Sequence, residues 1–190
     1  FPAVRLFISL TVFTGKIYPL IVTGIAKDVF PKQSGGSLVT ANGQIVGSAL
    51  LAQRLTADNY FWSRPSAGDD GTNYATVPSS ASNLGPTSSN LVAAVQSRLA
   101  SFREANGLAT NAPVPAEMVF ASGSGLDPDI SPAAAQLQID RVAKARHFSP
   151  AQTQTLAALV ERSIQPPQFG FLGEPRVNVL KLNLALDSLR

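Results

Sequence analysis

Small and acidic residues gather between residues 121 and 129, where the chain reads Ala-Ser-Gly-Ser-Gly-Leu-Asp-Pro-Asp. A glycine-rich loop that precedes a helix can hold a phosphate or another anion with its backbone N–H groups. The dinucleotide fingerprint, however, needs a third glycine where this chain has Pro128, and the Walker loop needs Gly-Lys-Ser/Thr, which the sequence lacks. We therefore expect a tight structural turn, whose N–H groups could still hold an anion or a partner's carboxylate.

Two carboxylates, Asp127 and Asp129, lie two residues apart in this loop. Paired carboxylates can bind a cation or act as acid and base, but the further ligands and the glutamate of a calcium loop are missing. Because Ser131 begins a predicted helix directly afterwards, we expect the pair to cap that helix and to stabilise its dipole. The candidates for contact with a partner protein in this loop are Ser122, Ser124, Asp127 and Asp129.

Arg64 is the most distinctive basic residue, because it lies within Tyr-Phe-Trp-Ser-Arg-Pro-Ser-Ala at residues 60–67. An arginine held between aromatic rings and a proline can clamp a partner's carboxylate with two parallel hydrogen bonds. It can equally tie down its own loop, and we favour this second role. Arg64 is kept as a candidate contact residue under either interpretation.

Catalytic and metal chemistry has little support in the composition. The chain has no cysteine, which excludes a disulfide scaffold and a thiolate site, and a single histidine, His147, which excludes a His-rich metal site. No Gly-x-Ser-x-Gly elbow exists, so a hydrolase built on Ser124, Asp127 and His147 is the weaker alternative. Residues 27–190 carry 13 basic and 12 acidic side chains without a basic cluster, so we expect no nucleic-acid partner.

The first 26 residues form an apolar segment in which only Arg5 and Lys16 are charged. A helix over residues 6–26 would be about 31 Å long, which matches the roughly 30 Å hydrocarbon core of a bilayer. Three interpretations are open: a secretory signal with a cleavage site at residues 24–26, a core helix of a soluble protein, and a retained single-pass anchor. We expect the anchor, and Arg5 favours a cytoplasmic N-terminus for it.

Lys16 lies near the middle of this segment, where a lysine costs about 2.5–3.5 kcal/mol on insertion scales. Pro19 follows three residues later, cannot donate to the carbonyl of Gly15, and is expected to kink the helix. One interpretation places Lys16 against a polar group of a partner helix. The other lets its long side chain reach the lipid headgroups, and both fit the sequence.

The rest of the chain is predicted to form a polar connector over residues 27–37 and a single mixed α/β domain over residues 38–190. The domain opens with a hairpin signal, since Asn42-Gly43 separates two short apolar runs. We expect its strands over residues 37–40 and 44–47.

Capping residues and apolar periodicity predict three helices. The first covers residues 89–105. The second opens at Ser131 and continues as one helix through Ala143. The third opens with a capping box formed by Ser149 and Gln152.

Three further segments are predicted to lack helix for most of their length. Residues 113–121 look extended, with a buried strand at 119–121, and the alternation at 176–180 predicts a strand that passes into a C-terminal helix. Residues 58–86 are expected to form a long ordered loop, because a segment rich in turn residues also holds the aromatic side chains of Tyr60, Phe61, Trp62 and Tyr74.

In this order the segments resemble the C subunit of the Kdp potassium-transporting P-type ATPases over nearly the whole chain. The most specific motifs are ASGSGLDPDISPAAA at residues 121–135 and FLGEPRVNVLKLNLALD at residues 171–187. The sequence departs from the family pattern at Lys16, where an apolar residue is expected, and at Trp62-Ser63, where histidine-glycine is usual. Further matching pieces are Tyr18-Pro19-Leu20, Gly36-Ser37-Leu38, Gly47-Ser48-Ala49-Leu50, Arg64-Pro65-Ser66-Ala67, Ser82-Asn83-Leu84-Gly85-Pro86 and Arg141-Val142-Ala143-Lys144-Ala145-Arg146.

The resemblance implies a subunit of the bacterial inner membrane that crosses the lipid bilayer with a single helix. Its N-terminus would be cytoplasmic and its C-terminal domain periplasmic. It implies three partners: a channel-like potassium-binding subunit, an ATP-hydrolysing P-type subunit and a very small membrane subunit. It also implies a catalytic chaperone that raises the ATP affinity of the hydrolysing subunit. Loops holding Arg64, Asn83 and residues 122–129, together with Lys16, are the candidate contacts.

Under this resemblance, other subunits handle ATP and potassium, and we expect no cofactor, metal or catalytic residue in this chain. ATP binding by the subunit itself is a proposal for the family that no nucleotide motif here supports. A solute-binding module is a further alternative, disfavoured because the cysteine of a lipobox is missing.

Overall fold

The computed structural model describes residues 1–68 and 79–189, and these fall into two compact units, Phe1–Ser48 and Ala49–Arg190. The mixed α/β fold that we expected is confirmed. The predicted division into an anchor (residues 1–26), a connector (27–37) and a domain (38–190) depends on where the membrane ends, and it stays a prediction.

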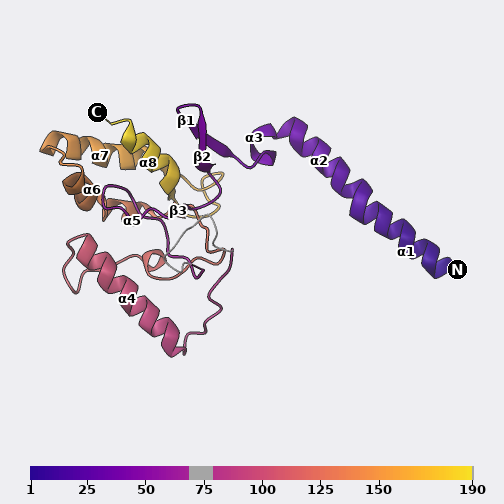
Figure 1. Ribbon diagram of the computed structural model, residues 1–190, viewed down its shortest axis with the longest axis horizontal. Coiled ribbons are helices and arrows are strands. Elements are labelled where there is room, and N and C mark those ends of the chain that lie inside the picture. The colour runs from indigo at the N-terminus through magenta and orange to yellow at the C-terminus, as the bar shows by residue number, and fades with distance from the viewer. Residues whose placement is uncertain (69–78, 190) are drawn as a thin grey trace. The chain divides into compact units, whose positions relative to one another are not determined.

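The first unit begins with a continuous helix over Pro2–Val29, made of α1 (Pro2–Val12), a π-helical turn (Phe13–Ile17) and α2 (Tyr18–Val29) (Figure 1). The helix is longer than the predicted residues 6–26 at each end, and none of its residues is buried in the chain. By length and composition it is the one helix among the described residues that could cross a membrane.

A π-helical turn lies just before Pro19, and the kink expected there stays a prediction. Since Pro19 has no N–H, the carbonyl of Gly15 loses its ordinary partner, and Tyr18 N donates to the carbonyl of Phe13 instead of closing an α-helical turn. Thr14 Oγ1 donates to the carbonyl of Leu10 at 2.7 Å. This polar side chain is therefore satisfied within the helix, as an apolar environment requires.

A short helix, α3 (Pro31–Ser34), lies within the segment expected to act as connector, and the predicted hairpin follows it. Strands β1 (Leu38–Ala41) and β2 (Gln44–Ser48) pair antiparallel, with Ala41 opposite Gln44. Asn42 and Gly43 have φ values of 51° and 77°, the left-handed pair that a two-residue type I′ turn requires. The hairpin prediction is confirmed.

The second unit packs helices around a small antiparallel sheet, in the order β3-β5-β4. Helix α7 packs against α5, α6 and α8, and β5 contacts α5 and α8. The elements are α4 (Ser89–Ala105), a 3₁₀ turn (Ala116–Met118), β3 (Asp129–Ile130), α5 (Pro132–Gln136), α6 (Ile139–Ala145), α7 (Pro150–Arg162), β4 (Ile164–Gln165), β5 (Arg176–Asn178) and α8 (Val179–Asp187). The core is formed by Phe61, Phe102, Met118, Ile130, Ala134, Ala135, Val142, Ala143, Leu156, Val160, Val177, Val179, Leu182 and Leu186.

Elements with strong local signals are where the sequence predicted them. Helix α4 has the predicted bounds. Helix α7 begins with the expected capping box, in which Ser149 Oγ accepts from Gln152 N and Gln152 Oε1 accepts from Ser149 N at 2.9 Å. The strand that passes into a C-terminal helix is also present, as β5 and α8.

Two predictions about secondary structure are wrong. The helix expected from Ser131 through Ala143 is interrupted at residues 137–138, because the buried Gln138 turns its amide toward the backbone of a distant loop. The buried strand at 119–121 does not form. Met118 N donates to the carbonyl of Pro115 in a 3₁₀ turn, and Phe120 is 42% exposed.

In the long loop expected at residues 58–86, Phe61 is fully buried. Residues 58–68 and 79–86 contain no helix or strand. Tyr74 lies outside the described residues.

Candidate contact site

An ion pair joins the two loops in which the sequence placed most candidate residues. Arg64 Nη1 donates to Asp127 Oδ2 at 2.6 Å, with side chains 24% and 32% exposed. Beside it, Ser122 N donates to the carbonyl of Pro65 at 3.2 Å. Arg64 thus fastens its own loop to residues 122–129, the role that we favoured. Its contact with a partner stays a prediction.

The two aspartates do not cap helix α5. Ser131 Oγ does so, by accepting from Ala134 N at 3.1 Å. Asp129 Oδ2 pairs with Arg176 Nε at 3.1 Å, and its Oδ1 accepts from the Asn178 amide at 2.9 Å. The capping interpretation is therefore wrong, because the tertiary fold brings arginine partners to both carboxylates. Within residues 1–68 and 79–189 no cluster of three or more acidic or histidine side chains could hold a metal ion.

The glycine and serine residues of this loop make a closed turn. Gly125 has φ of +72°, and a Cβ placed there would lie 2.8 Å from the carbonyl of Ser80 and 2.9 Å from Ser66 Oγ. Ser122 is buried, and its hydroxyl accepts from Asp127 N at 3.4 Å. Ser124 is exposed, and its hydroxyl accepts from Leu126 N at 3.1 Å. Because these N–H groups bond within the loop, the turn is better suited to structure than to holding a phosphate.

Arg141, which the sequence analysis named only as part of a family motif, bonds to the aromatic segment at residues 58–62. It is 6% exposed, and its Nη1 donates to the carbonyls of Asp58 at 2.7 Å and Tyr60 at 3.0 Å. Its Nε donates to Asn106 Oδ1 at 3.0 Å, and its guanidinium carbon lies 4.1 Å from the centroid of the Trp62 ring. Burial lowers the pKa of Arg141 to about 10, against a smaller raising effect of Asp58. The side chain therefore stays cationic at neutral pH.

Two buried amides complete the support of this loop. Trp62 N donates to Gln138 Oε1 at 2.7 Å, and the Gln138 amide donates to the carbonyl of Trp62 at 3.3 Å. Likewise, Phe61 N donates to Asn183 Oδ1 at 2.8 Å, and the Asn183 amide donates to the carbonyl of Phe61 at 2.9 Å. Each amide side chain thus bonds to both the N–H and the C=O of one loop residue, groups that a neighbouring strand would otherwise have to satisfy. The only signal for them in the sequence was a polar residue within an apolar helical stripe.

A cavity of about 410 Å³ opens between this loop and α4. Its lining includes Arg54, Arg64 and Arg98, and no acidic side chain is among the described residues that line it. Arg98 Nη1 donates to the carbonyl of Val119 at 3.2 Å. Arg64 Nη1 donates to the carboxylate of Asp127 at 2.6 Å. At least two of the three arginines thus help to hold the walls of the cavity.

The remaining candidates take no part in the ion pair. His147 is exposed at the end of α6, and its side chain forms no hydrogen bond with Ser124 or Asp127 in the described part of the chain. Asn83 is exposed with φ of 52°. Lys16 is exposed within the π-helical turn of the first unit.

Together these features define a class of protein. One helix can span a membrane, a mixed α/β unit follows it, and the charged side chains of the candidate site bond to one another in a scaffold for exposed loops. They define the class as a mixed α/β protein with one N-terminal helix that is long and apolar enough to cross a membrane.

The comparison with known families is more specific. The family model described as KdpC, the K⁺-transporting ATPase c chain, matches residues 1–188. The chain therefore belongs to the KdpC family and is a subunit of a K⁺-transporting ATPase complex. The resemblance found in the sequence is confirmed.

Three relatives agree with this assignment, and each is named Potassium-transporting ATPase KdpC subunit. The protein of Gemmatimonas aurantiaca is 53% identical over 189 residues, covering 99% of this chain and 92% of the relative. That of Rhodospirillum rubrum is 52% identical over 186 residues, covering 98% and 93%. That of Methylococcus capsulatus is 49% identical over 189 residues, covering 100% and 97%.

Proposed function

We propose that the chain is a non-catalytic accessory subunit of a high-affinity, ATP-driven potassium uptake pump. It would bind a channel-like potassium-binding subunit, an ATP-hydrolysing P-type subunit and a small membrane subunit. The observation that carries this proposal is the engagement of both candidate carboxylates in ion pairs, Asp127 with Arg64 and Asp129 with Arg176. Carboxylates paired with arginines in this way are better suited to fixing the position of loops than to acid–base or metal chemistry.

Its proposed effect on the pump is that of a catalytic chaperone, which stabilises the assembly and raises the ATP affinity of the hydrolysing subunit. The closed turn at residues 122–127 supports action through protein contacts, because the N–H groups of Gly125, Leu126 and Asp127 bond to oxygen atoms of the turn itself. ATP and potassium would then be handled by the other subunits, and this chain would hold no cofactor.

The proposed topology places the N-terminus in the cytoplasm and the second unit in the periplasm of the inner membrane. The support is the apolar helix Pro2–Val29, with Arg5 near its start. The chain has no cysteine, so single-cysteine variants can be labelled without background. In intact cells, a membrane-impermeant maleimide should label Thr110→Cys and not Ala3→Cys. The reverse labelling would refute this topology.

Lys16 is proposed to meet a polar group of a partner helix. It lies in the π-helical turn, and such turns are frequent at functional sites. Within the first unit no side chain bonds to it. In a bilayer, a partner's polar group would offset the cost of its charge.

The loops holding Arg64, Asn83 and residues 122–129 are the proposed contact surface of the second unit. The test is purification of the pump with Arg64→Ala or Asp127→Ala. If these loops bind a partner, either variant should weaken assembly or lower potassium-stimulated ATP hydrolysis. Intact assembly with unchanged hydrolysis would remove both residues from the contact surface.

A further inference from the structure

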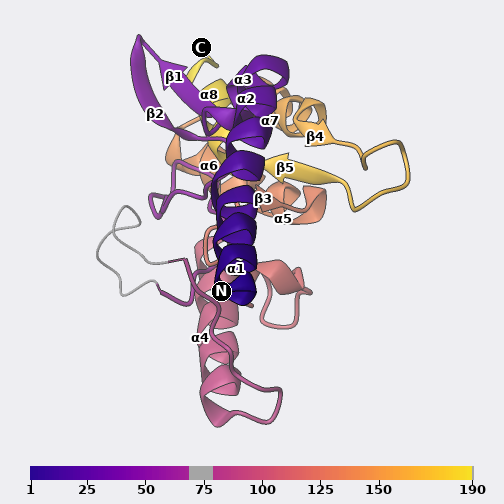
Figure 2. The same cartoon turned by 90° about the vertical axis from the view of Figure 1, so that its right-hand side faces the viewer.

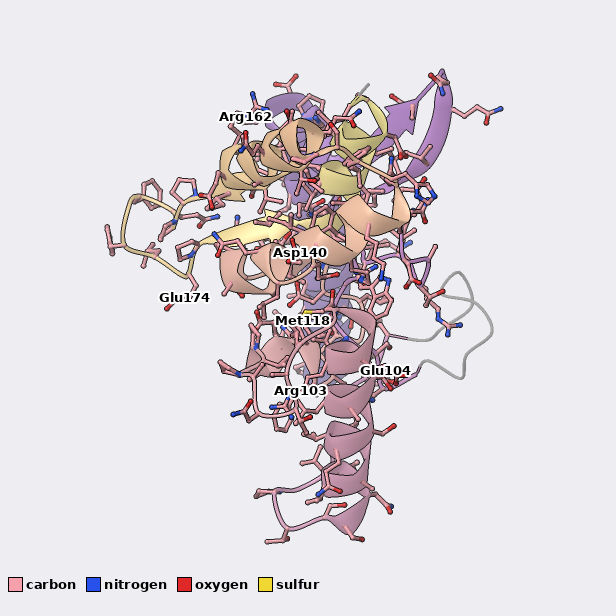
Figure 3. All side chains as sticks on the ribbon, turned by 90° about the vertical axis from the view of Figure 1, so that its left-hand side faces the viewer. Arg103, Glu104, Met118, Asp140, Arg162 and Glu174 are labelled. Carbon is pink, nitrogen blue, oxygen red and sulfur yellow. The ribbon has the colours of Figure 1, made fainter. Side chains whose placement is uncertain are left out.

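Among the described residues of the second unit, the most exposed aromatic side chains lie on the hairpin turn between β4 and β5. Phe169 is 85% exposed, Phe171 is 75% exposed and Leu172 is 48% exposed. The turn extends away from the helices that cover the sheet (Figure 2). Glu174 lies on the same projecting segment (Figure 3). Large apolar side chains grouped at one exposed tip are typical of an interaction site.

Backbone hydrogen bonds close the tip. Gln168 N donates to the carbonyl of Leu172, and Leu172 N donates to that of Gln168, each at 2.9 Å. Behind it, Ile164 pairs with Val177 in the sheet, and Val177 is fully buried. A preformed tip loses little conformational freedom on binding, which favours affinity.

Phe169 adopts a backbone conformation that its side chain disfavours. Its φ is 54°, followed by 83° at Gly170. A bulky residue in the left-handed region costs of order 1–3 kcal/mol, and such strain persists at sites of function. Packing within the second unit does not repay this cost, because the ring is exposed.

We propose that this aromatic tip docks into an apolar recess of another subunit of the same pump. Aromatic side chains in apolar pockets are the usual anchors of protein interfaces. The inference rests on membership of the pump complex and is independent of the proposed effect on ATP affinity.

Charge favours a protein recess over a lipid surface. No lysine or arginine occurs between Ser163 and Pro175, and the one charged residue there is the exposed Glu174. Segments that bind membrane surfaces are rich in basic residues, and an anionic surface would repel Glu174. A recess with a basic residue at its rim would complement the tip.

Photocrosslinking in the assembled pump tests the proposal. We would replace Phe169 or Phe171 with p-benzoylphenylalanine in the full chain, with Phe120, an exposed aromatic residue elsewhere in the unit, as the matched control. We expect an adduct between position 169 or 171 and another pump subunit, identified by mass spectrometry, and none from position 120. Adducts with lipid alone, with a second copy of this chain, or with nothing while the pump is intact would each overturn the proposal.

Substitution gives a second test. Phe169→Asn relieves the left-handed strain while removing the ring, and Phe171→Ser removes the other ring. We expect the double variant to melt at an unchanged or higher temperature but to dissociate from the detergent-solubilised pump at least tenfold faster. Phe120→Ser should leave dissociation unchanged. Equal dissociation rates for the double variant and the unmodified chain would overturn the proposal.

Discussion

The guanidinium of Arg141 stacks on Trp62, with its central carbon 4.1 Å from the centroid of the indole ring. The same group donates to the carbonyls of Asp58 and Tyr60, so one buried cation holds the aromatic loop on both sides of its turn. Arg64 follows two residues after Trp62 and pairs with Asp127. The position of the candidate contact loops therefore depends on a residue that is itself buried.

Replacing Arg141 should destabilise the second unit strongly. Arg141→Met would leave Asn106 Oδ1 and the carbonyls of Asp58 and Tyr60 without their buried donor, at a cost of about 3 kcal/mol or more. Urea unfolding of the full chain in detergent measures the loss. Arg162→Met, on the exposed face of α7, is the matched control and should cost under about 0.5 kcal/mol. Equal stability of the two variants would contradict this role for Arg141.

Gly125 should not tolerate a side chain. Gly125→Ala adds a Cβ at 2.8 Å from the carbonyl of Ser80, in a residue with φ of +72°. The combined strain and overlap should cost about 2–4 kcal/mol. Gly123→Ala is the control, because a Cβ there meets nothing within 4 Å. Thermal unfolding of both variants measures the difference. Equal stability of Gly125→Ala and Gly123→Ala would contradict the close packing of Gly125 against Ser80 and Ser66.

The pair of Arg64 and Asp127 should contribute modestly to stability. Both side chains are partly exposed, so a double-mutant cycle with Arg64→Gln and Asp127→Asn should give a coupling of about 0.5–1 kcal/mol. Asp127→Asn keeps an oxygen that can accept from Asp129 N, so the turn itself is preserved. A coupling indistinguishable from zero would contradict the expected contribution of the pair to stability.

Lys16→Leu tests the proposed contact within the membrane. If Lys16 meets a polar group of a partner, its loss should leave that group unsatisfied and speed dissociation of the solubilised pump at least tenfold. Lys27→Leu, near the end of the same helix, is the control and should have little effect. An unchanged dissociation rate for Lys16→Leu would favour a side chain that reaches the headgroups instead.

Local signals were sufficient for much of the fold. The turn at Asn42-Gly43 and the cap at Ser149 depend on residues close in sequence, and both were predicted. The strand at 119–121 was wrong because apolar composition alone does not separate a strand from a turn that buries consecutive side chains. Met118 and Val119 are both buried, so their burial does not alternate.

The candidate site depends on contacts between distant residues, which patterns do not contain. Arg64 and Asp127 were named as candidates, but their pairing joins positions 63 residues apart. Gln138 interrupts a helix because it bonds to Trp62, 76 residues away. Arg141 and Asn183 were missed for the same reason, since a polar residue on a helix indicates its role only when the loop that it supports is known.

The central claim is that this chain acts on the pump through contacts and performs no chemistry itself. The most direct test compares the purified pump with and without this chain, by the ATP dependence of potassium-stimulated hydrolysis. We predict that adding the full chain restores a stable complex and lowers the KM for ATP, and that the chain alone hydrolyses no ATP. ATP hydrolysis by the chain alone, or an equally stable pump with the same KM in its absence, would contradict the account.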